Sequence, residues 1–493
     1  MKLNNSTLDQ LSPEVSVPAY ERSNLRQGIV HIGVGGFHRA HEAVYTHQLL
    51  QTGGSPDWSI CGVGLREGDR AMHQVLSEQD HLYTLIELGA DRTNTLSVIG
   101  AITGFMFAPE EQDAVIEKMA SSEVKIVSLT ITEGGYNVDD NTGRFNENHP
   151  DVLHDLENPQ QPRTVFGYLT EALCRRRERN LPPFTVLSCD NLPENGQVAR
   201  GALLTFARLR DAELADWIGD KVSFPSSMVD RITPGTNDKH RQWLKENYDL
   251  EDGWPVICEP FYQWVLEDDF CNGRPDWEAV GVQFTDDVAP YERMKIRLLN
   301  ASHSAMAYLG YLSGYRYTHE VMADERFSRF IRSFMDEDVT PILGEISGID
   351  VPAYKQTLIE RFSNPQMGDE LARLCMDGSS KIPKFLVPTV QTLVNEGRPL
   401  SRVAMIVASW ALYLRGKDEQ GQPHEINDPM APRLQAAVED RANLTPEFLG
   451  MTDLFGTTLA SSSDFEEAFD RALDKLETKG VFAALGETWP DEH

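Results

Sequence analysis

The sequence has few cysteines, no long apolar run and a deficit of positive charge. The six cysteines of this 493-residue chain form no CxxC pair and no close Cys/His spacing. Neither a disulfide framework nor a structural zinc site is therefore expected. The absence of a run of about 18 apolar residues excludes a membrane-spanning helix, and the first residues, MKLNNSTLDQLSPEV, lack the apolar core of a signal peptide. We expect reduced thiols and a cytoplasmic location.

The charge balance excludes further classes of partner. Asp and Glu number 76 against 45 Lys and Arg, which gives a net charge of −31. Nucleic acids and anionic membrane surfaces are bound by basic faces, so neither is an expected partner. With 41% hydrophobic and 25% charged residues, the composition is typical of a globular protein with two or more domains. We expect small-molecule partners that carry little negative charge.

The N-terminal half alternates β-rich runs with helical patterns. Runs at 29–34, 58–65, 125–131 and 184–190 predict parallel strands joined by crossover helices. Further β-like stretches at 82–89 and from Pro255 indicate an enlarged sheet. From about Arg293 onward the pattern is helical almost throughout, with clear helices at 402–416 and 464–480 and a surface loop at 416–429. We place an α/β domain at 1–286 and a mainly α-helical domain at 287–493.

A glycine-rich segment, GVGGFHRAH, follows the first predicted strand and precedes a helical run. Its glycines let the turn pass close to a pyrophosphate, and N–H groups at the start of the helix would cradle the phosphates. His38 stands where the G-x-G-x-x-G pattern has its third glycine. We interpret the N-terminal domain as an expanded Rossmann-type domain whose cofactor contacts include Gly33, Gly35, Gly36, Phe37, His38 and Arg39.

The second predicted strand ends in Arg66-Glu67-Gly68-Asp69. An acidic residue at this place bonds the ribose hydroxyls of the adenosine and repels a 2′-phosphate. Glu67 and Asp69 therefore favour NAD over NADP. Two alternatives remain open: Arg66 holds the 2′-phosphate of NADP instead, or the segment is a solvated loop.

Two later strands are followed by polar residues. TITEGGYN places Glu133 after the strand at 125–131, and SCDNLPENG places Asn191 after the strand at 184–190. The carboxyl ends of strands line the ligand crevice in open α/β sheets. The Asn191 carboxamide is thus a candidate donor to a substrate oxygen; the alternative is an ordinary turn residue.

The segment YERMKIRLLNASHSAM, at 291–306, carries proton-handling groups on one side. On an α-helix at about 100° per residue, Glu292, Lys295, Asn300 and His303 lie within an arc of roughly 140°. The remaining circumference is largely apolar, so Lys295 is expected to be buried, and a buried lysine that loses its charge is a general base. The alternative is a core helix with a Glu292–Lys295 ion pair.

Six sequence blocks occur in one order along the chain: GVGGFHRAH, TITEGGYN, SCDNLPENG, FPSSMVDRITP, KIRLLNASH and RFSNPQMGDELARLCMDGSSKIPKF. Together they resemble the polyol-specific long-chain dehydrogenases, the mannitol dehydrogenase family. The blocks span residues 33–385. The resemblance implies NAD-dependent, metal-independent interconversion of D-mannitol and D-fructose, with D-arabinitol and D-sorbitol as further substrates. It also implies a Rossmann-type domain followed by a helical substrate domain. Long-chain members of this family are often monomers.

The resemblance assigns roles to individual residues. Lys295 matches the catalytic base, and Asn191 with Asn300 matches the carboxamide pair that binds the reacting oxygen. Glu133 and Glu292 lie near the base in the family pattern, with Glu133 assigned to proton exchange with solvent. Substrate hydroxyls would be held by Asp230, His303, Arg373 and Lys381.

Three alternatives to a mannitol dehydrogenase stay open. Fructuronate and tagaturonate reductases share these blocks, and Arg373 and Lys381 would then bind a carboxylate. A sugar-phosphate dehydrogenase is disfavoured because the C-terminal half has no evident phosphate-sized cluster of basic residues. The last alternative, a non-catalytic nucleotide-binding protein, is disfavoured by the intact set of Lys295, Asn191 and Asn300.

Overall fold

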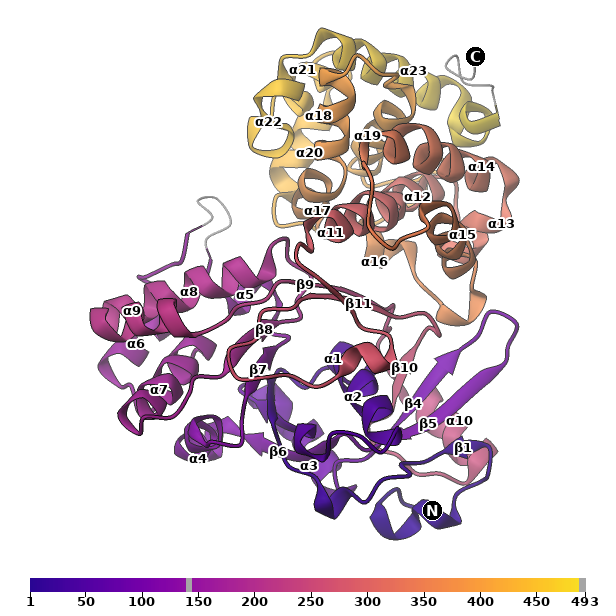
Figure 1. The fold of residues 1–493 in the computed structure, drawn as a ribbon. Helices are drawn as coiled ribbons and strands as arrows, with labels where there is room; N and C mark the ends of the chain where they lie inside the picture. Colours follow the sequence, from indigo (N-terminus) through magenta and orange to yellow (C-terminus); the bar gives the residue numbers. More distant parts are fainter. Residues whose placement is uncertain (139–143, 487–493) are drawn as a thin grey trace. The chain divides into compact units, whose positions relative to one another are not determined.

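The computed structural model describes residues 1–138 and 144–486. The chain divides into two compact units, Met1–Ala289 and Pro290–His493 (Figure 1). Among the described helices, none combines the length and apolar composition needed to cross a bilayer.

The first unit is built on a five-stranded sheet in the order β6-β3-β2-β7-β8. All four strand pairs are parallel. The strands are β2 (Ile29–Ile32), β3 (Ile60–Gly64), β6 (Ile102–Phe107), β7 (Ile126–Leu129) and β8 (Thr185–Ser188). The four strands predicted from the sequence are confirmed, and with them the Rossmann-type class. Because the chain proceeds from β2 to one side through β3 and to the other through β7, the strand order reverses at β2, which is where such sheets bind ligands.

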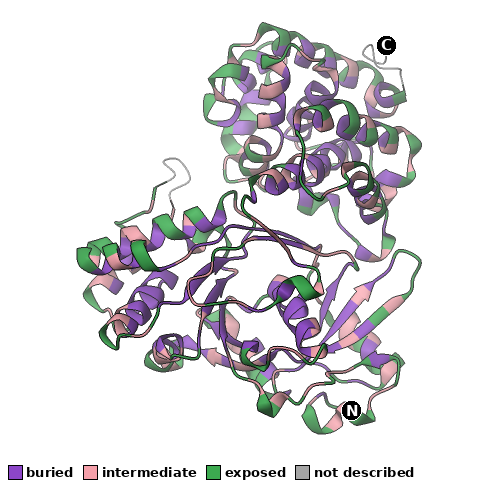
Figure 2. Ribbon diagram, in the orientation of Figure 1, coloured by how far each residue is buried: buried purple, intermediate pink, exposed green. Residues whose placement is uncertain are grey.

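Apolar clusters cover both faces of this sheet, which explains why its strands are mostly apolar on both sides. In β2, Val30 and Ile32 pack on one face and Ile29 on the other. One face is covered by α4 (Ala108–Ala120), α7 (Val165–Glu178), α8 (Asn195–Arg210) and α9 (Ala212–Lys221). The other face is covered in part by α2 (Glu42–Gln51) and α3 (Arg70–Glu78). The strands β2, β3, β7 and β8 are buried at every residue, whereas the edge strand β6 is only partly buried (Figure 2).

The additional strands form two separate small sheets and do not widen the main one. One sheet has the order β1-β5-β4-β10 and the other β12-β11-β9. Their strands are β1 (Val15–Ser16), β4 (Tyr83–Leu88), β5 (Asn94–Ile99), β9 (Ser227–Asp230), β10 (Val256–Cys258), β11 (Gln263–Glu267) and β12 (Gln283–Thr285). Tyr83, Val256 and Trp264 belong to the core beside α2. The extra strands therefore pack on a face of the main sheet, where their apolar side chains are buried.

The second unit is helical throughout its described elements, as predicted. Its central helix α19 (Ser401–Tyr413) packs on both α12 (Ala301–Leu312) and α23 (Ser463–Gly486). The predicted helix at 464–480 continues past Gly480, whose φ of 76° breaks the helical path. The remaining α-helices are α11 (Ala289–Lys295), α13 (Thr318–Ala323), α14 (Glu325–Ser333), α15 (Val351–Phe362), α16 (Leu371–Cys375), α17 (Gly378–Phe385), α18 (Val387–Asn395), α20 (Ala431–Glu439), α21 (Leu444–Leu449) and α22 (Thr452–Ala460).

The segment at 291–306 is not one uniform α-helix. A π-helical turn, η6 (Ile296–Asn300), separates α11 from α12. A π turn closes i→i+5 hydrogen bonds, so it holds an extra residue and rotates the residues after it away from their positions on an α-helix. The uniform α-helix assumed for the predicted arc is therefore wrong, whereas the grouping of the four polar residues on one side stays a prediction. Single π turns are frequent at functional sites.

Candidate active site

The turn after β2 requires glycine at its first position. Gly33 has a φ of 97°, and a Cβ there would lie 2.1 Å from the carbonyl oxygen of Thr130. Gly35 caps α1 (Gly36–Ala40) without a side chain, and a Cβ on Gly36 would meet nothing closer than 3.6 Å. The N–H groups of a helix's first turn have no acceptor within the helix. The turn therefore suits the pyrophosphate of a dinucleotide.

The side chains of α1 point into the first unit. Arg39 is buried, donates from Nη1 to the Trp254 carbonyl oxygen at 2.6 Å and lies over the Tyr83 ring. Phe37 stacks on His41, with ring centroids 4.9 Å apart. The predicted cofactor contacts of Phe37, His38 and Arg39 stay predictions. These contacts fix α1 in the first unit and thereby hold the glycine turn that precedes it.

A buried cluster of His31, His38 and Glu42 lies below this turn. The Nδ1 atoms of the two imidazoles lie 3.0 and 3.2 Å from Oε2 of Glu42. Burial acts to raise the pKa of Glu42, but the interactions with the two nearby imidazoles outweigh it and hold this pKa well below its usual range. The pKa of His38 is lowered to about 3 by burial.

These three groups have the residue types of a metal site but the wrong geometry. The two imidazole rings are stacked at 3.4 Å with an angle of 12° between their planes. A metal ion lies in the plane of an imidazole that binds it, and one ion cannot lie in two nearly parallel planes this far apart. His31 Nε2 instead reaches Thr130 Oγ1 at 2.9 Å. The cluster is a hydrogen-bonded support for the Gly33 turn.

The two acidic residues after β3 are engaged differently. The Glu67 carboxylate pairs with Arg70 at 2.5 Å, and Arg70 also pairs with Glu110. Asp69 folds back onto the end of the strand, where its Oδ2 accepts a hydrogen bond from the Arg66 N–H at 2.9 Å. A Cβ on Gly64 would lie 2.7 Å from the Cβ of Asp69. Asp69 is therefore the acidic group at the carboxyl end of β3.

Glu133 and Asn191 follow neighbouring strands. Glu133 is exposed in the short helix α5 (Thr132–Gly135) after β7, and Asn191 is exposed directly after β8. Asp190, which the sequence reasoning did not select as a site residue, is buried between these segments and accepts hydrogen bonds from the N–H groups of Ile131 and Thr132. Burial raises the pKa of Asp190. Its position directly after a buried strand was the available signal.

Asp230 ends β9 and is buried. The next residue, Arg231, donates from Nη1 to the Ala40 carbonyl oxygen at 2.6 Å and from Nε to the Glu259 carbonyl oxygen at 3.0 Å. The segment after β9 is thereby attached to the end of α1.

In the second unit, Glu292 and Lys295 are buried one helical turn apart on α11. Asn300 ends the π turn, and its buried Oδ1 has no hydrogen-bond partner among the described residues. His303 is half-buried on α12, where its ring packs on Phe362 with centroids 4.8 Å apart. The π turn thus lies between the predicted base and the predicted oxyanion donor.

Arg373 and Lys381 lie on helices that pack near this segment. α16 packs on α12, and α17 packs on η6. Arg373 is exposed and pairs with Asp369 at 2.5 Å. Lys381 Nζ donates to the carbonyl oxygens of Arg373 and Leu374, each at 3.2 Å, and burial lowers its pKa. The second unit thereby gathers its predicted site residues on neighbouring helices.

Comparisons with known families match nearly the whole chain. The model of the mannitol dehydrogenase Rossmann domain matches residues 27–279. The model of the mannitol dehydrogenase C-terminal domain matches residues 287–477. The chain belongs to the mannitol dehydrogenase family, which confirms the resemblance found in its sequence blocks.

Individual relatives cover the chain from end to end. The mannitol 2-dehydrogenase of Phaeosphaeria nodorum is 48% identical over 491 residues, 99% of this chain and 85% of the relative. That of Aspergillus fumigatus is 46% identical over 495 residues, 98% of each chain. The structure of Pseudomonas fluorescens mannitol 2-dehydrogenase, solved as a ternary complex with NAD and D-mannitol, matches with 54% identity and a TM-score of 0.88, covering 98% of this chain and 99% of that one.

A solved D-sorbitol dehydrogenase in substrate-free form also matches. It is 38% identical with a TM-score of 0.91, and the match covers 98% of this chain and 100% of that chain. Relatives that act on different polyols thus share this fold.

Proposed function

We propose that this protein is an NAD-dependent, metal-independent dehydrogenase that interconverts D-mannitol and D-fructose. The observation that carries the proposal is the buried Lys295 on α11, followed through a π turn by Asn300. Support comes from the Pseudomonas fluorescens relative, whose complex holds NAD and D-mannitol.

Oxidation of a secondary alcohol requires that the hydroxyl lose a proton while the carbon loses a hydride, and NAD, when bound, accepts that hydride. Lys295 takes the hydroxyl proton on Nζ. A lysine accepts a proton only when it is neutral, and burial disfavours its charged form. The carboxamides of Asn191 and Asn300 donate hydrogen bonds to the developing alkoxide.

Carboxylates complete the proton transfer in this proposal. Glu133, exposed in α5 after β7, exchanges the proton with solvent. Glu292, buried on the same helix as Lys295, acts beside the base. In the reverse direction Lys295 returns the proton to the oxygen of the ketose, so one arrangement serves both directions.

The residues of the first unit suit NAD. Backbone groups of the turn containing Gly33, Gly35 and Gly36 hold the pyrophosphate, for which the positive φ of Gly33 and the open space at Gly36 provide room. Asp69, at the carboxyl end of β3, bonds the adenosine ribose and disfavours a 2′-phosphate.

A neutral substrate suits the second unit better than a hexuronate. The charge of Arg373 is balanced by Asp369, and Lys381 is bound to two carbonyl oxygens. Both cations therefore already have partners within the protein. We propose that they bind the hydroxyl groups of a neutral substrate and not a carboxylate. Asp230 and His303 complete the proposed hydroxyl contacts. D-arabinitol and D-sorbitol are proposed as further substrates, and the D-sorbitol dehydrogenase match supports the second of them.

The test is NADH oxidation at 340 nm with purified protein, comparing D-fructose, D-fructuronate and D-tagaturonate. EDTA is included in one series, and NADPH replaces NADH in another. The proposal predicts preference for fructose with NADH and no effect of the chelator. Preference for either uronate would identify a hexuronate reductase, and inactivity on all three would favour a non-catalytic protein.

A further inference from the structure

We infer that Asp190 is a positioning residue: its buried carboxylate holds the loop that carries Glu133, and its main-chain carbonyl oxygen restrains the segment that carries Asn191. The inference rests on the proposed function, because it assigns Glu133 and Asn191 the roles given above. Asp190 itself touches neither substrate nor cofactor in this account.

The carboxylate connects two loops that are distant in sequence. Its Oδ1 accepts from the Thr132 N–H at 2.9 Å, and its Oδ2 accepts from the Ile131 N–H at 3.0 Å and the Tyr136 hydroxyl at 2.7 Å. These donors bracket Glu133 on both sides in the sequence. Hydrogen bonds to an ionised acceptor are stronger than neutral ones, so the carboxylate fixes this loop against the end of β8.

The backbone that precedes Glu133 is strained. Thr132 has a φ of 61°, a conformation that is an outlier for a β-branched residue. Strain of this kind persists only where the surroundings hold it, and it clusters at functional sites. The bond from the Thr132 N–H to Asp190 is a direct restraint on that conformation. The direction of Glu133, the next residue, depends on it.

The same residue anchors the segment that carries Asn191. The Asp190 carbonyl oxygen accepts from the Leu192 N–H at 2.9 Å and from Nδ2 of Asn195 at 3.0 Å. Buried Asn195 in turn exchanges hydrogen bonds with the backbone of Ser227 on β9, at 2.8 and 2.9 Å. The backbone of Asn191 is therefore restrained from both sides.

The first variant is Asp190→Asn, which keeps the size of the side chain but loses its charge and one acceptor. We expect kcat for fructose reduction to fall about 10- to 100-fold, as misplacement of catalytic groups by an ångström does. The dissociation constant for NADH should stay within about twofold, because the glycine turn and Asp69 are unchanged.

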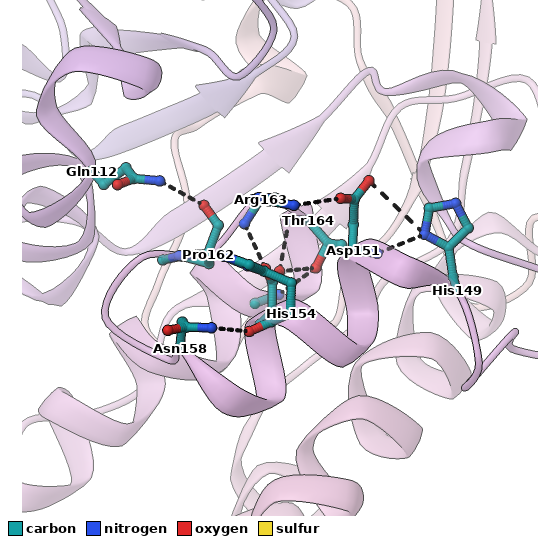
Figure 3. Close-up of polar contacts among 10 residues, drawn as sticks. Gln112, His149, Asp151, His154, Asn158, Pro162, Arg163 and Thr164 are labelled. Carbon is teal, nitrogen blue, oxygen red and sulfur yellow. Dashed lines mark hydrogen bonds and ion pairs between the residues drawn. The ribbon is translucent and has the colours of Figure 1, made fainter.

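The matched control is Asp155→Asn. Asp155 is also buried, and it also accepts two backbone N–H bonds and one hydroxyl bond, from Arg163 N, Thr164 N and Thr164 Oγ1 at 2.7 to 2.8 Å. Figure 3 shows Arg163 and Thr164 in this contact network, with His154 beside them. The control should lower the melting temperature to a similar degree and leave kcat unchanged.

A rescue variant separates positioning from general instability. Thr132→Gly removes the strain, because glycine adopts positive φ at no steric cost. When Thr132→Gly is added to Asp190→Asn, part of the lost kcat should be recovered. If Asp190→Asn alone does not fold, the double variant is used in its place. Combined with Glu133→Gln, Asp190→Asn should cost less than the product of the two separate losses.

Each outcome bears on the inference. A kcat for Asp190→Asn equal to that of Asp155→Asn, no recovery with Thr132→Gly, or multiplicative losses with Glu133→Gln would overturn it. A wild-type protein without activity on fructose would instead overturn the proposed function. Failure of the two claims is thus distinguishable in the same set of assays.

Discussion

The buried, uncharged histidines of the first unit should make it sensitive to mild acid. His47, on α2, is buried, and its Nδ1 lies 2.7 Å from the Tyr20 hydroxyl. Burial, reinforced by Arg22, lowers its pKa from 6.5 to about 4. Between pH 6.5 and 4 the unfolded chain therefore binds a proton at this residue that the folded chain does not, so stability falls as the pH falls through this window.

The size of the effect comes from the pKa shift. One pKa unit corresponds to about 1.4 kcal/mol, so His47, with its pKa lowered from 6.5 to about 4, costs about 2 kcal/mol when the pH falls from 7 to 4.5. The variant His47→Asn keeps an acceptor near the Tyr20 hydroxyl and cannot take up the proton. Between pH 7 and 4.5, the variant should lose less unfolding free energy than the wild type, and the difference should equal the contribution of His47.

The assay is equilibrium urea unfolding at pH 7.0 and 4.5, with the m value compared between proteins. His149→Asn, at a half-exposed histidine on the surface, is the matched control and should keep the wild-type pH dependence. Equal pH dependence in His47→Asn and wild type would refute the reasoning, since the proton uptake would then lie elsewhere.

Three further predictions concern the cofactor and the second unit. Asp69→Ala should raise kcat/KM with NADPH relative to NADH; an unchanged ratio would mean that the ribose is read elsewhere. Gly33→Ala should weaken NADH binding in a fluorescence titration, because its Cβ would lie 2.1 Å from the Thr130 carbonyl oxygen, and normal affinity would remove this turn from the cofactor site. Arg402→Met removes the guanidinium whose Nε lies 2.6 Å from the buried carboxylate of Asp338 and should cost about 3–5 kcal/mol in urea unfolding; a loss below about 1 kcal/mol would contradict this.

The sequence was sufficient for the sheet and the glycine turn. Buried strands of a parallel sheet are mostly apolar on both sides, and β2 and β7 follow this pattern except at the buried residues His31 and Ser128. The turn after β2 needs a residue with positive φ, and Gly33 stood at that place. Strand burial and the need for glycine in this turn depend on the residues of the segment itself, so the sequence alone predicts them.

Other features depend on contacts that a sequence pattern does not carry. Over so short a stretch, the π turn at Ile296–Asn300 has the same apolar spacing as an α-helix. An analysis of hydrophobic periodicity therefore could not detect it. Of the extra strands, the sequence analysis found those at 82–89 and from Pro255 and missed the others. Their pairing into separate sheets depends on partners distant in the chain, as β4 with β10 shows. Asp190 was missed as a site residue because its importance comes from donors in another loop.

The central claim is that Lys295 is the general base of an NAD-dependent polyol dehydrogenase, and Lys295→Ala tests it most directly. Steady-state turnover with D-mannitol and NAD is measured beside the affinity for NADH. The account predicts a loss of turnover of several orders of magnitude, consistent with about 10²- to 10⁴-fold or more for removal of a positioned base, with NADH binding retained. Turnover near that of the wild type would contradict it.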